Sequence, residues 1–480
     1  MVVQHNLQAM NANRMLNITT GSQSKSAEKL SSGYRINRAA DDAAGLSISE
    51  KMRKQIRGLD QASTNAEDGV SAVQTAEGAL TEVHSMLQRM NELAVQASNG
   101  TNSQTDRDAI QSEIDQLTTE IDRVAETTKF NETYLLKGDS NGATKNVYMK
   151  GHDAGLNGTL TDGATTATFK IAAGALDDGK KVTIGGKEYT IGTAKDTVTT
   201  EVKKAANDGD QVTVNGKTYT YTTKGGTGKT DAGWVEGTAT PAEGATLDIE
   251  AAKFAAADGD KITLKLTGKE AVDYSAADFD ADGVSKSDSS IISAAKAISL
   301  MEAELKSANN IGAVDSAATM GTKPTYASAT GAEFTINKGY ATVSEKLNFN
   351  LHVGSDADMT NKINVNIETM NSNYLGIKGL NVADDSGIAA TYAVDAISDA
   401  LQKVSEQRSS LGAVQNRLEH TIANLDNVVE NTTSAESRIR DVDMAEEMVE
   451  YSKNNILAQA GQSMLAQANQ ATQGVLSLLG

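Results

Sequence analysis

The segment VQTAEGALTEVHSMLQRMNELA, residues 73–94, decides how the first part of this chain folds. It lies within a seven-residue register of apolar side chains that comprises Met52, Leu59, Ala66, Val73, Leu80, Leu87 and Ala94. A companion row is supplied largely by Ala62, Ala76, Val83 and Met90. Two such rows are typical of a coiled-coil seam. At 1.5 Å per residue the register spans roughly 63 Å of helix, and a helix of that length in water needs partner helices.

A matching register lies near the other end of the chain. It comprises Ile397, Val404, Leu411, Leu418, Leu425 and Ile439, with Thr432 at one polar position. Its companion row comprises Val414, Val428, Ala435 and Val442. Because the two seams match and neither region contains proline, we expect two unkinked helices that pack together. The middle of the chain is then expected to be an insertion between the two paired helices.

A second helix is predicted after the first seam. Asn99-Gly100 ends the long helix. Apolar residues then follow at spacings of four, three, four and three, namely Ile110, Ile114, Leu117, Ile121 and Val124. This spacing predicts a shorter amphipathic helix that packs back on the first.

Residues 138–382 lack helical periodicity and read as short strands joined by turns rich in Gly, Asp, Asn and Thr. The stretch VTIGGKEY at 182–189 recurs as VTVNGKTY at 212–219, and each copy reads as strand, two-residue turn, strand. A weaker third copy begins at Asp258 and continues through 262–264. Alternating apolar residues at 347–353 and 363–367 predict a separate hairpin before the chain returns to helix.

The two ends of the chain carry thinner apolar stripes. The first comprises Val3, Leu7 and Met10; the second comprises Leu457, Ala460, Met464, Ala468, Ala471, Val475 and Leu478. The residues around the second stripe are mostly Gln, Asn and Ser, which suit neither a well-solvated face nor a complete core. We therefore expect the ends to gain order by packing against neighbouring molecules. A frayed, disordered tail is the alternative.

The composition excludes several classes of protein. The 480 residues include 63 acidic and 44 basic side chains, a net charge of −19, which argues against a large nucleic-acid interface. The absence of cysteine excludes a disulfide framework, a thiol nucleophile and a zinc–thiolate site. No stretch approaches the ~20 consecutive apolar residues of a membrane helix. The first residues also lack the basic and apolar regions of a conventional secretory signal.

Little in the sequence suits catalysis. The chain has five histidines, none of them in a His-Glu-x-x-His pattern, and neither a nucleophile elbow nor a dinucleotide fingerprint is present. A metallopeptidase between about 138 and 345 would need that pattern there, where His152 is the only histidine. Residues 225–230 end in Gly-Lys-Thr, but Thr223 stands where a phosphate loop needs its first glycine. We therefore predict a protein that is not an enzyme and has no cofactor.

One acidic turn partly matches a metal-binding pattern. Asp278, Asp280 and Asp282-Gly283 match the start of a calcium loop. Ser289 stands where the bidentate acid of such a loop is needed, so a solvated acidic turn is the preferred interpretation and we predict no metal.

Several long motifs follow one another along both arms of the chain. The stretch SSGYRINRAADDAAGLSI at 31–48, continued by 87–96, 102–104 and 121–123, closely resembles the N-terminal signature of bacterial flagellins. The stretches LGAVQNRL at 411–418, LAQANQ at 465–470 and VLSLL at 475–479 are similar to their C-terminal half. The match covers about 1–137 and 346–480. The middle matches only as the place where flagellins carry variable outer domains.

This resemblance implies a mainly α fold with β structure that is elongated and multi-domain. Both chain ends would form a long antiparallel coiled-coil stem, and a β-rich outer domain would be inserted between them. Residues 1–43 and 441–480 would form an inner layer of terminal helices. Residues 44–137 and 346–440 would form the helical stem with its β-hairpin, and 138–345 the outer domain or domains.

The resemblance also implies a function. The chain would be a structural subunit that polymerises into the extracellular flagellar filament for motility, after export through the flagellar type III channel. Its partners would be further copies of itself, a flagellar export chaperone and cap proteins, with neither a membrane nor a nucleic acid among them. The polymerisation contacts would include Val3, Leu7, Met10, Leu457, Met464, Val475 and Leu478. A hook–filament junction protein and a surface adhesin are the alternatives.

Flagellins that resemble this chain are also detected, as monomers, by an innate Toll-like receptor. The matching positions are Gln88, Arg89, Leu93, Gln96 and Glu113. The resemblance implies that the same surface is a contact between subunits, buried in the filament and exposed in the monomer. On a helical wheel Arg89, Leu93 and Gln96 lie roughly 125° from the seam of the first helix. We therefore expect these three side chains to lie outside the intramolecular core.

Overall fold

The computed structural model describes residues 7–139, 142–225, 231–242, 245–384 and 386–479, with side chains described as far as Gln470. The chain divides into two units. The first comprises Met1–Gln74, Phe349–Val365 and Gly412–Gly480. The second comprises Thr75–Asn348 and Asn366–Leu411.

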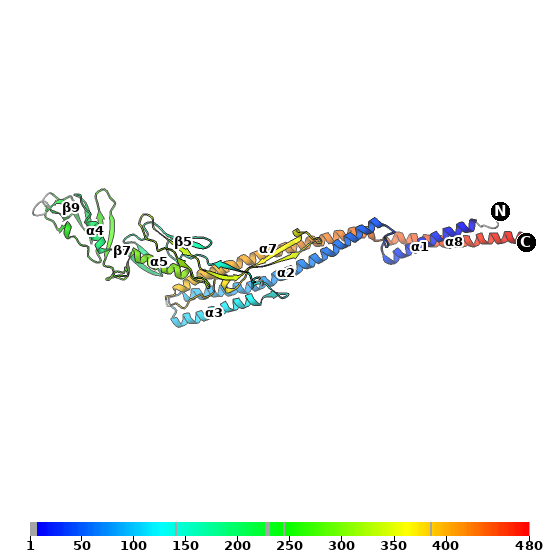
Figure 1. Ribbon diagram of the computed structural model, residues 1–480, viewed down its shortest axis with the longest axis horizontal. Coiled ribbons are helices and arrows are strands. Elements are labelled where there is room, and N and C mark those ends of the chain that lie inside the picture. The colour runs from blue at the N-terminus through cyan, green and yellow to red at the C-terminus, as the bar shows by residue number, and fades with distance from the viewer. Residues whose placement is uncertain (1–6, 140–141, 226–230, 243–244, 385, 480) are drawn as a thin grey trace. The chain divides into compact units, whose positions relative to one another are not determined.

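Both arms of the chain are helical, as predicted (Figure 1). The N-terminal arm contains α1 (Leu7–Ser32), α2 (Ala43–Ala97) and α3 (Gln104–Thr127). The C-terminal arm contains α7 (Ile388–Arg440) and α8 (Met444–Leu479). The end of α2 just before Asn99-Gly100 and the amphipathic α3 are confirmed. Ser103 begins α3 with a capping box, because its side chain and that of Asp106 each accept the other's backbone N–H.

In the first unit α2 and α7 run antiparallel. Ser63 Oγ lies 3.3 Å from a carboxylate oxygen of Asp426, and Arg53 pairs with Glu436 at 3.4 Å, so numbers rise along one helix as they fall along the other. Ala66 of α2 and Leu418 of α7 share one buried cluster with Ile363. The two predicted seams therefore meet.

The predicted hairpin packs on this helical pair. It consists of β18 (Leu347–His352) and β19 (Lys362–Ile367). Leu351 and Ile363 contribute to the cluster around Ala66. The strands approach α2 so closely that a Cβ on Gly69 would lie 2.2 Å from Leu351 Cδ1. A larger residue in the middle of this helix would therefore force the Leu351 side chain to move.

In the second unit the seam positions are completely buried: Leu80, Leu87 and Ala94 on α2, and Ile397, Val404 and Leu411 on α7. An ion pair between Glu77 and Arg408, at 3.5 Å, continues the antiparallel pairing there. In the first unit Met52, Leu59 and Ile439 are only half-buried and Val428 is exposed. The seam is thus less covered toward the start of α2 and the end of α7.

The middle of the chain contains the β structure. The largest sheet has the order β11-β10-β9-β8-β12-β13-β7-β14, with β6 also paired to β7. Its strands are β6 (Lys181–Ile184), β7 (Lys187–Ala194), β8 (Gln211–Val214), β9 (Lys217–Gly225), β10 (Asp231–Glu236), β11 (Ile249–Glu250), β12 (Lys261–Lys265), β13 (Val272–Ala277) and β14 (Ile291–Ser293). Both predicted hairpins, β6-β7 and β8-β9, turn in two residues. Gly185, Gly186, Asn215 and Gly216 have the positive φ angles of 55°, 71°, 48° and 87° that such turns require.

Three smaller sheets complete the β structure. One has the order β15-β16-β5-β4, from β4 (Thr159–Asp162), β5 (Thr166–Ile171), β15 (Thr319–Met320) and β16 (Ala332–Asn337). The others pair β3 (Thr144–Tyr148) with β17 (Tyr340–Ser344), and β1 (Lys129–Phe130) with β2 (Thr133–Tyr134).

The middle also contains helices that we did not predict: α4 (Lys195–Val202), α5 (Ala294–Ala308) and α6 (Ser372–Leu375). Ser293 caps α5 by accepting the backbone N–H of Lys296. Ile298, Met301 and Leu305 of α5 enter a core shared with Phe169 and Phe334. A second core surrounds Trp234, whose ring contacts those of Tyr221 and Phe254. Across the part of the chain that the structure describes, no helix is both long and apolar enough to traverse a lipid bilayer.

Candidate functional site

The stretch 31–48 joins α1 to α2 and holds that connection against the one between α7 and α8. Gly33, with φ of 76°, ends α1 and donates its N–H to Lys29 O at 2.8 Å. Arg35 N donates to Arg440 O at 2.7 Å, and Val442 N donates to Gly33 O at 3.0 Å. These two backbone bonds fix the positions at which the terminal helices leave the stem helices.

Tyr34 lies at the centre of this junction. Its ring is contacted by Arg440 at 4.8 Å and by Arg53 at 5.8 Å, measured from guanidinium carbon to ring centroid. Arg53 also pairs with Glu436 at 3.4 Å, and Arg440 pairs with Glu50 at 2.9 Å. Both arginines therefore join α2 to the end of α7 while they cover the tyrosine.

The rest of the same stretch shapes the start of α2. The Asp41 carboxylate accepts the backbone N–H of Arg38 at 2.9 Å, which lowers the pKa of Asp41. Asp42 caps α2 by accepting Gly45 N at 2.8 Å. A Cβ on Gly45 would lie 2.7 Å from the buried Ile36, so only glycine fits there without movement. The residues on which the family resemblance rests therefore also stabilise the connection before α2 and the start of that helix.

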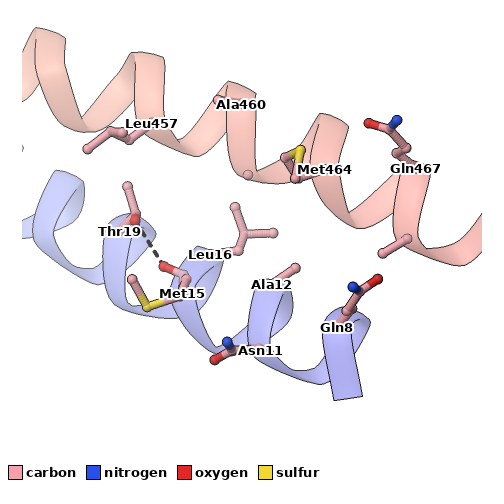
Figure 2. A pocket seen from close by; sticks show the side chains of 12 residues that line it. Gln8, Asn11, Ala12, Met15, Leu16, Thr19, Leu457, Ala460, Met464 and Gln467 are labelled. Carbon is pink, nitrogen blue, oxygen red and sulfur yellow. Dashed lines mark hydrogen bonds between the residues drawn. The ribbon is translucent and has the colours of Figure 1, made fainter. Parts of the chain in front are cut away.

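Beyond this junction α1 and α8 lie side by side (Figure 1). They run antiparallel: Lys29 pairs with Glu447 at 3.3 Å, and near the other end Gln8 and Gln467 line the same groove. The groove has a volume of about 750 Å³. It is lined by Gln8, Asn11, Ala12, Met15, Leu16, Thr19, Leu457, Ala460, Gly461, Met464, Gln467 and Ala468. Figure 2 shows Leu16 between the two helices, with Gln8 and Gln467 together at one end.

The terminal helices expose large apolar side chains. Of the proposed polymerisation residues, Leu7 is 70% exposed, Met10 63%, Leu457 48% and Met464 61%. Further exposed apolar residues on the same two helices are Met15, Ile18, Met444, Met448, Val449 and Ile456. Val3 lies outside the described residues; Val475 and Leu478 belong to α8, but their side chains are not described.

This surface is suited to binding another apolar helix. Each buried methylene contributes about 0.8 kcal/mol, so a row of side chains of this size can stabilise a contact between molecules. The structure places the two predicted apolar stripes on one pair of helices, with Leu7 and Met10 on α1 and Leu457 and Met464 on α8. Their role in polymerisation stays a prediction at this point.

A second candidate surface lies on α2 and α3. Arg89 Nε donates to Glu113 Oε1 at 2.9 Å, which raises the pKa of the Arg89 guanidinium, and Glu92 accepts a further bond at 3.2 Å. Gln88 contacts His84 at 3.2 Å, between the amide nitrogen and Nε2. Gln88, Arg89 and Gln96 are exposed and Glu113 is half-buried. The structure therefore brings Arg89 and Glu113, 24 residues apart, into one site.

Leu93 does not share the exposure of its neighbours. Its side chain is 1% exposed, so the expectation that it lies outside the intramolecular core is wrong. The helical wheel measured its angle from one seam only. The Arg89–Glu113 pair shows that α3 lies along this side of α2, and a helix with neighbours on two sides buries residues on both.

The acidic turn at 278–283 has its carboxylates engaged. Asp278 pairs with Lys195 at 2.8 Å and with Lys286 at 3.1 Å. Asp280 accepts the backbone N–H groups of Asp282 and Val284. Among the described residues no group of three or more His, Asp or Glu side chains is arranged to hold a metal ion. Residues 226–230, weighed as part of a phosphate loop, lie outside the described residues.

The junction around Tyr34 is the part of the site that sequence reasoning missed. In the sequence Tyr34 and Arg35 appear only as part of the motif at 31–48, which predicts no contact for either of them. The pairing of Tyr34 with Arg440 joins residues about 400 positions apart, which no local periodicity can reveal. The only available signal was an aromatic side chain and several arginines close to both helix breaks.

Comparison with known proteins gives consistent matches at both ends of the chain. Residues 3–141 match the bacterial flagellin N-terminal helical region, and residues 394–479 match the bacterial flagellin C-terminal helical region. A flagellin of Clostridium tyrobutyricum is 41% identical over 480 residues, covering 98% of this chain and 100% of that protein. Flagellins of Halalkalibacterium halodurans and Bacillus subtilis are each 34% identical, with complete coverage of both chains. A solved structure, FliC from Burkholderia pseudomallei, is 20% identical, covers 73% of this chain and 99% of its own, and has a TM-score of 0.28.

Proposed function

Because this chain belongs to the bacterial flagellin family, we propose that it polymerises through the antiparallel pair of α1 and α8. The protein is a structural subunit of the bacterial flagellar filament. The observation that carries the proposal is the exposed apolar side chains gathered on these two helices, among them Leu7, Met10, Leu457 and Met464. In a lone subunit such side chains face water, so covering them with neighbouring subunits supplies a driving force for assembly.

The proposed arrangement within the subunit follows three parts. Residues 1–43 and 441–480 form an inner layer, 44–137 and 346–440 the stem, and 138–345 the outer domain. The breaks in helix between α1 and α2 and between α7 and α8 support the first boundary. Export through the flagellar type III channel, with a chaperone and cap proteins as partners, belongs to the same proposal. The junction-protein and adhesin alternatives are not favoured, since the full-length relatives are flagellins.

Seeded polymerisation tests the assembly surface. The variant Leu457→Gln/Met464→Gln places amides in the groove, and we expect its filament elongation rate to fall at least about tenfold, because each 1.4 kcal/mol lost per contact is a factor of ten. Met359→Gln is the matched control, since Met359 is exposed but lies outside the terminal helices. Elongation of the groove variant at the control rate would remove α8 from the contact.

We also propose that an innate Toll-like receptor recognises the free subunit at the surface formed by Gln88, Arg89, Leu93, Gln96 and Glu113, where it contacts the members that are not buried, and that neighbouring subunits cover the same surface in the filament. The exposed Arg89–Glu113 pair supports a polar contact at this surface, with the buried Leu93 holding the backbone beneath it.

Receptor binding tests this second proposal. We expect Arg89→Ala to weaken binding of the purified monomer to the receptor ectodomain by about 1–3 kcal/mol. Arg123→Ala is the control, because Arg123 is an exposed arginine on α3 that forms a similar pair with Glu120. If both variants bind as the unaltered subunit does, the receptor contacts a different face.

A further inference from the structure

Sulfur is unevenly distributed in this protein. Methionine is its only sulfur-containing residue, with 14 methionines and no cysteine in the chain. Among the described residues, the methionines with exposed side chains are Met10, Met15, Met359, Met444, Met448 and Met464. All of these except Met359 lie on α1 or α8. Methionines in the interior, such as Met90, Met301 and Met370, are almost completely buried. An oxidant that reaches the subunit from water therefore meets methionine sulfur mainly on the terminal helices.

Two of these methionines line the groove between the terminal helices. Met15 belongs to α1 and Met464 to α8, and their side chains are 56% and 61% exposed. Figure 2 shows both of them between the Thr19–Leu457 end of the groove and the Gln8–Gln467 end. The surface that a neighbouring subunit would cover thus presents an accessible thioether from each helix.

We propose that Met15 and Met464 form an oxidation site that controls assembly, at which a peroxide converts the groove of the free subunit from apolar to polar and so blocks its incorporation. This inference rests on the proposed role of α1 and α8 in polymerisation and adds a regulation of that surface.

The chemistry needs only the thioether and a hydroperoxide. The methionine sulfur donates an electron pair to one peroxide oxygen, the O–O bond breaks and an S–O bond forms. The other oxygen leaves with the proton, as water from hydrogen peroxide or as an alcohol from an organic peroxide. The sulfur is oxidised by two electrons and the peroxide is reduced by two. The product, methionine sulfoxide, is polar where the thioether was apolar.

The consequence for assembly follows from desolvation. A sulfoxide oxygen in open solvent is hydrated, but a neighbouring helix that covers the groove would strip that water away. Burying a polar group without a full set of hydrogen bonds is unfavourable, whereas burying a thioether is favourable. Once covered in the filament, the same sulfurs are shielded from the oxidant. Sensitivity is therefore confined to the subunit before it assembles, and enzymatic reduction of the sulfoxide reverses it.

The test is oxidation of free subunits with hydrogen peroxide, followed by mapping of sulfoxides by mass spectrometry and by seeded polymerisation. We expect sulfoxide at Met15 and Met464 and a fall in elongation rate of at least about tenfold, reversed by the two methionine sulfoxide reductases that together reduce both sulfoxide epimers. Filaments treated in the same way should remain unmodified at both positions.

Two matched variants locate the effect. Met15→Leu/Met464→Leu keeps the groove apolar and of similar volume, so oxidation should not change its elongation rate from the rate of the same variant before oxidation. Met10→Leu/Met448→Leu carries the same changes at exposed methionines of the same helices outside the groove lining, and it should remain sensitive. Loss of elongation in the oxidised groove variant, to the extent seen in the unaltered protein, overturns the assignment.

The failure of each proposal has its own signature. If untreated subunits do not elongate on seeds, the proposed assembly function fails. If untreated and oxidised subunits elongate equally although Met15 and Met464 carry sulfoxide, only the oxidation site fails. Should the groove variant be unable to elongate even before oxidation, the Met10→Leu/Met448→Leu variant decides: loss of its elongation on oxidation, with recovery after reduction, supports the site, and unchanged elongation overturns it.

Discussion

At Glu132 the backbone has a φ of 68°, a left-handed conformation that favours glycine. Together with Asn131, at 43°, it forms the two-residue turn between β1 and β2. The two longer hairpins place glycine at the second turn position, Gly186 and Gly216. A side chain at this position is strained by about 1–2 kcal/mol.

We therefore expect Glu132→Gly to raise the free energy of unfolding by about 0.5–1 kcal/mol, the relief of strain less the extra entropy of glycine in the unfolded chain. Urea unfolding measures the change. Glu132→Ala is the control, because it removes the same carboxylate and keeps the Cβ. Equal stabilisation by both variants would assign the effect to charge and not to the turn.

Asp178 gives a pH dependence that can be tested. Its carboxylate accepts the backbone N–H of Ser275 at 2.7 Å and of Gly179 at 3.0 Å. Burial outweighs these bonds and raises its pKa from 3.8 to about 6. The folded state therefore binds the proton more tightly than the unfolded state. The resulting stability is fully present below pH 3.8 and is lost as the pH rises through about 6.

Asp178→Asn keeps the size of the side chain and removes its charge, although its NH2 group cannot accept a backbone N–H as the second carboxylate oxygen does. We expect the stability of this variant relative to the unaltered protein to rise by about 1 kcal/mol between pH 5 and pH 8, a figure discounted for solvent screening of a partly exposed group. Unfolding monitored by the fluorescence of Trp234, which lies in the same sheet, provides the measurement. A difference that does not change across this range would contradict the raised pKa.

At the same scale, sequence reasoning located exposed site residues better than buried ones. Arg89, Gln88 and Gln96 are exposed as expected, whereas Leu93 is not. Periodicity gives the angle of a side chain about its own helix but not the number of neighbours around that helix. The face of α2 that meets α3 could be known only after the position of α3 was known.

Among the elements, the long helices followed from their seven-residue register and the strands from alternation and turn residues. Helix α5 was missed because its short apolar stripe, Ile298, Met301 and Leu305, lies within a region dominated by strand patterns. The order of strands in the large sheet could not be predicted either. Its strand β7 pairs in parallel with β13 and β14, which follow it by about 80 to 100 residues, and turn chemistry gives no information on such pairings.

The sequence repeat in the middle proved to extend beyond its hairpins. Each copy begins with an Asp-Gly turn: Asp178-Gly179, Asp208-Gly209 and Asp258-Gly259. In each turn the glycine N–H donates to a carbonyl of the later strand, that of Ile191, Tyr221 or Ala276, at 2.8, 3.1 and 2.9 Å. The three glycines have φ of 74°, 97° and 87°. The repeat is thus one structural module used three times.

Helix α2 allows a paired test of glycine in a long helix. Gly69→Ala would place a Cβ 2.2 Å from Leu351 Cδ1, so we expect it to destabilise the protein by about 1–3 kcal/mol. Gly78→Ala, in the same helix with nothing within 4 Å of the new Cβ, should stabilise it by about 0.5–1 kcal/mol. Thermal unfolding followed by circular dichroism compares the two. Stabilisation by both would mean that the hairpin does not press on α2.

For the molecule as a whole, the resemblance supplied the family, and the pairing of both arms was confirmed by the antiparallel α2 and α7. The three-part domain division stays a prediction. Seven-residue registers could predict that two helices pair, but not the polar junction around Tyr34 at which the terminal pair begins. That junction depends on backbone and arginine contacts between the α1–α2 and α7–α8 connections. Such contacts do not produce a periodic pattern in the sequence.

Removing residues 441–480 tests whether α8 is needed for assembly but not for the folding of the second unit. Trp234 lies in the second unit, and its fluorescence reports the thermal unfolding of that unit. We expect the truncated protein to keep this fluorescence and this unfolding temperature and to lose seeded elongation completely. Filament formation by the truncated protein, seen by electron microscopy, would exclude α8 from the assembly contact.

The ion pair between Lys29 and Glu447 joins residues 418 positions apart. During synthesis at about 5–20 residues per second, α1 leaves the ribosome roughly 20–80 s before its partner helix α8 has been synthesised. Throughout that interval every nascent copy carries an uncovered amphipathic stripe, beside other nascent copies in the same condition. Aggregation of nascent chains through this stripe is therefore a hazard that begins during translation.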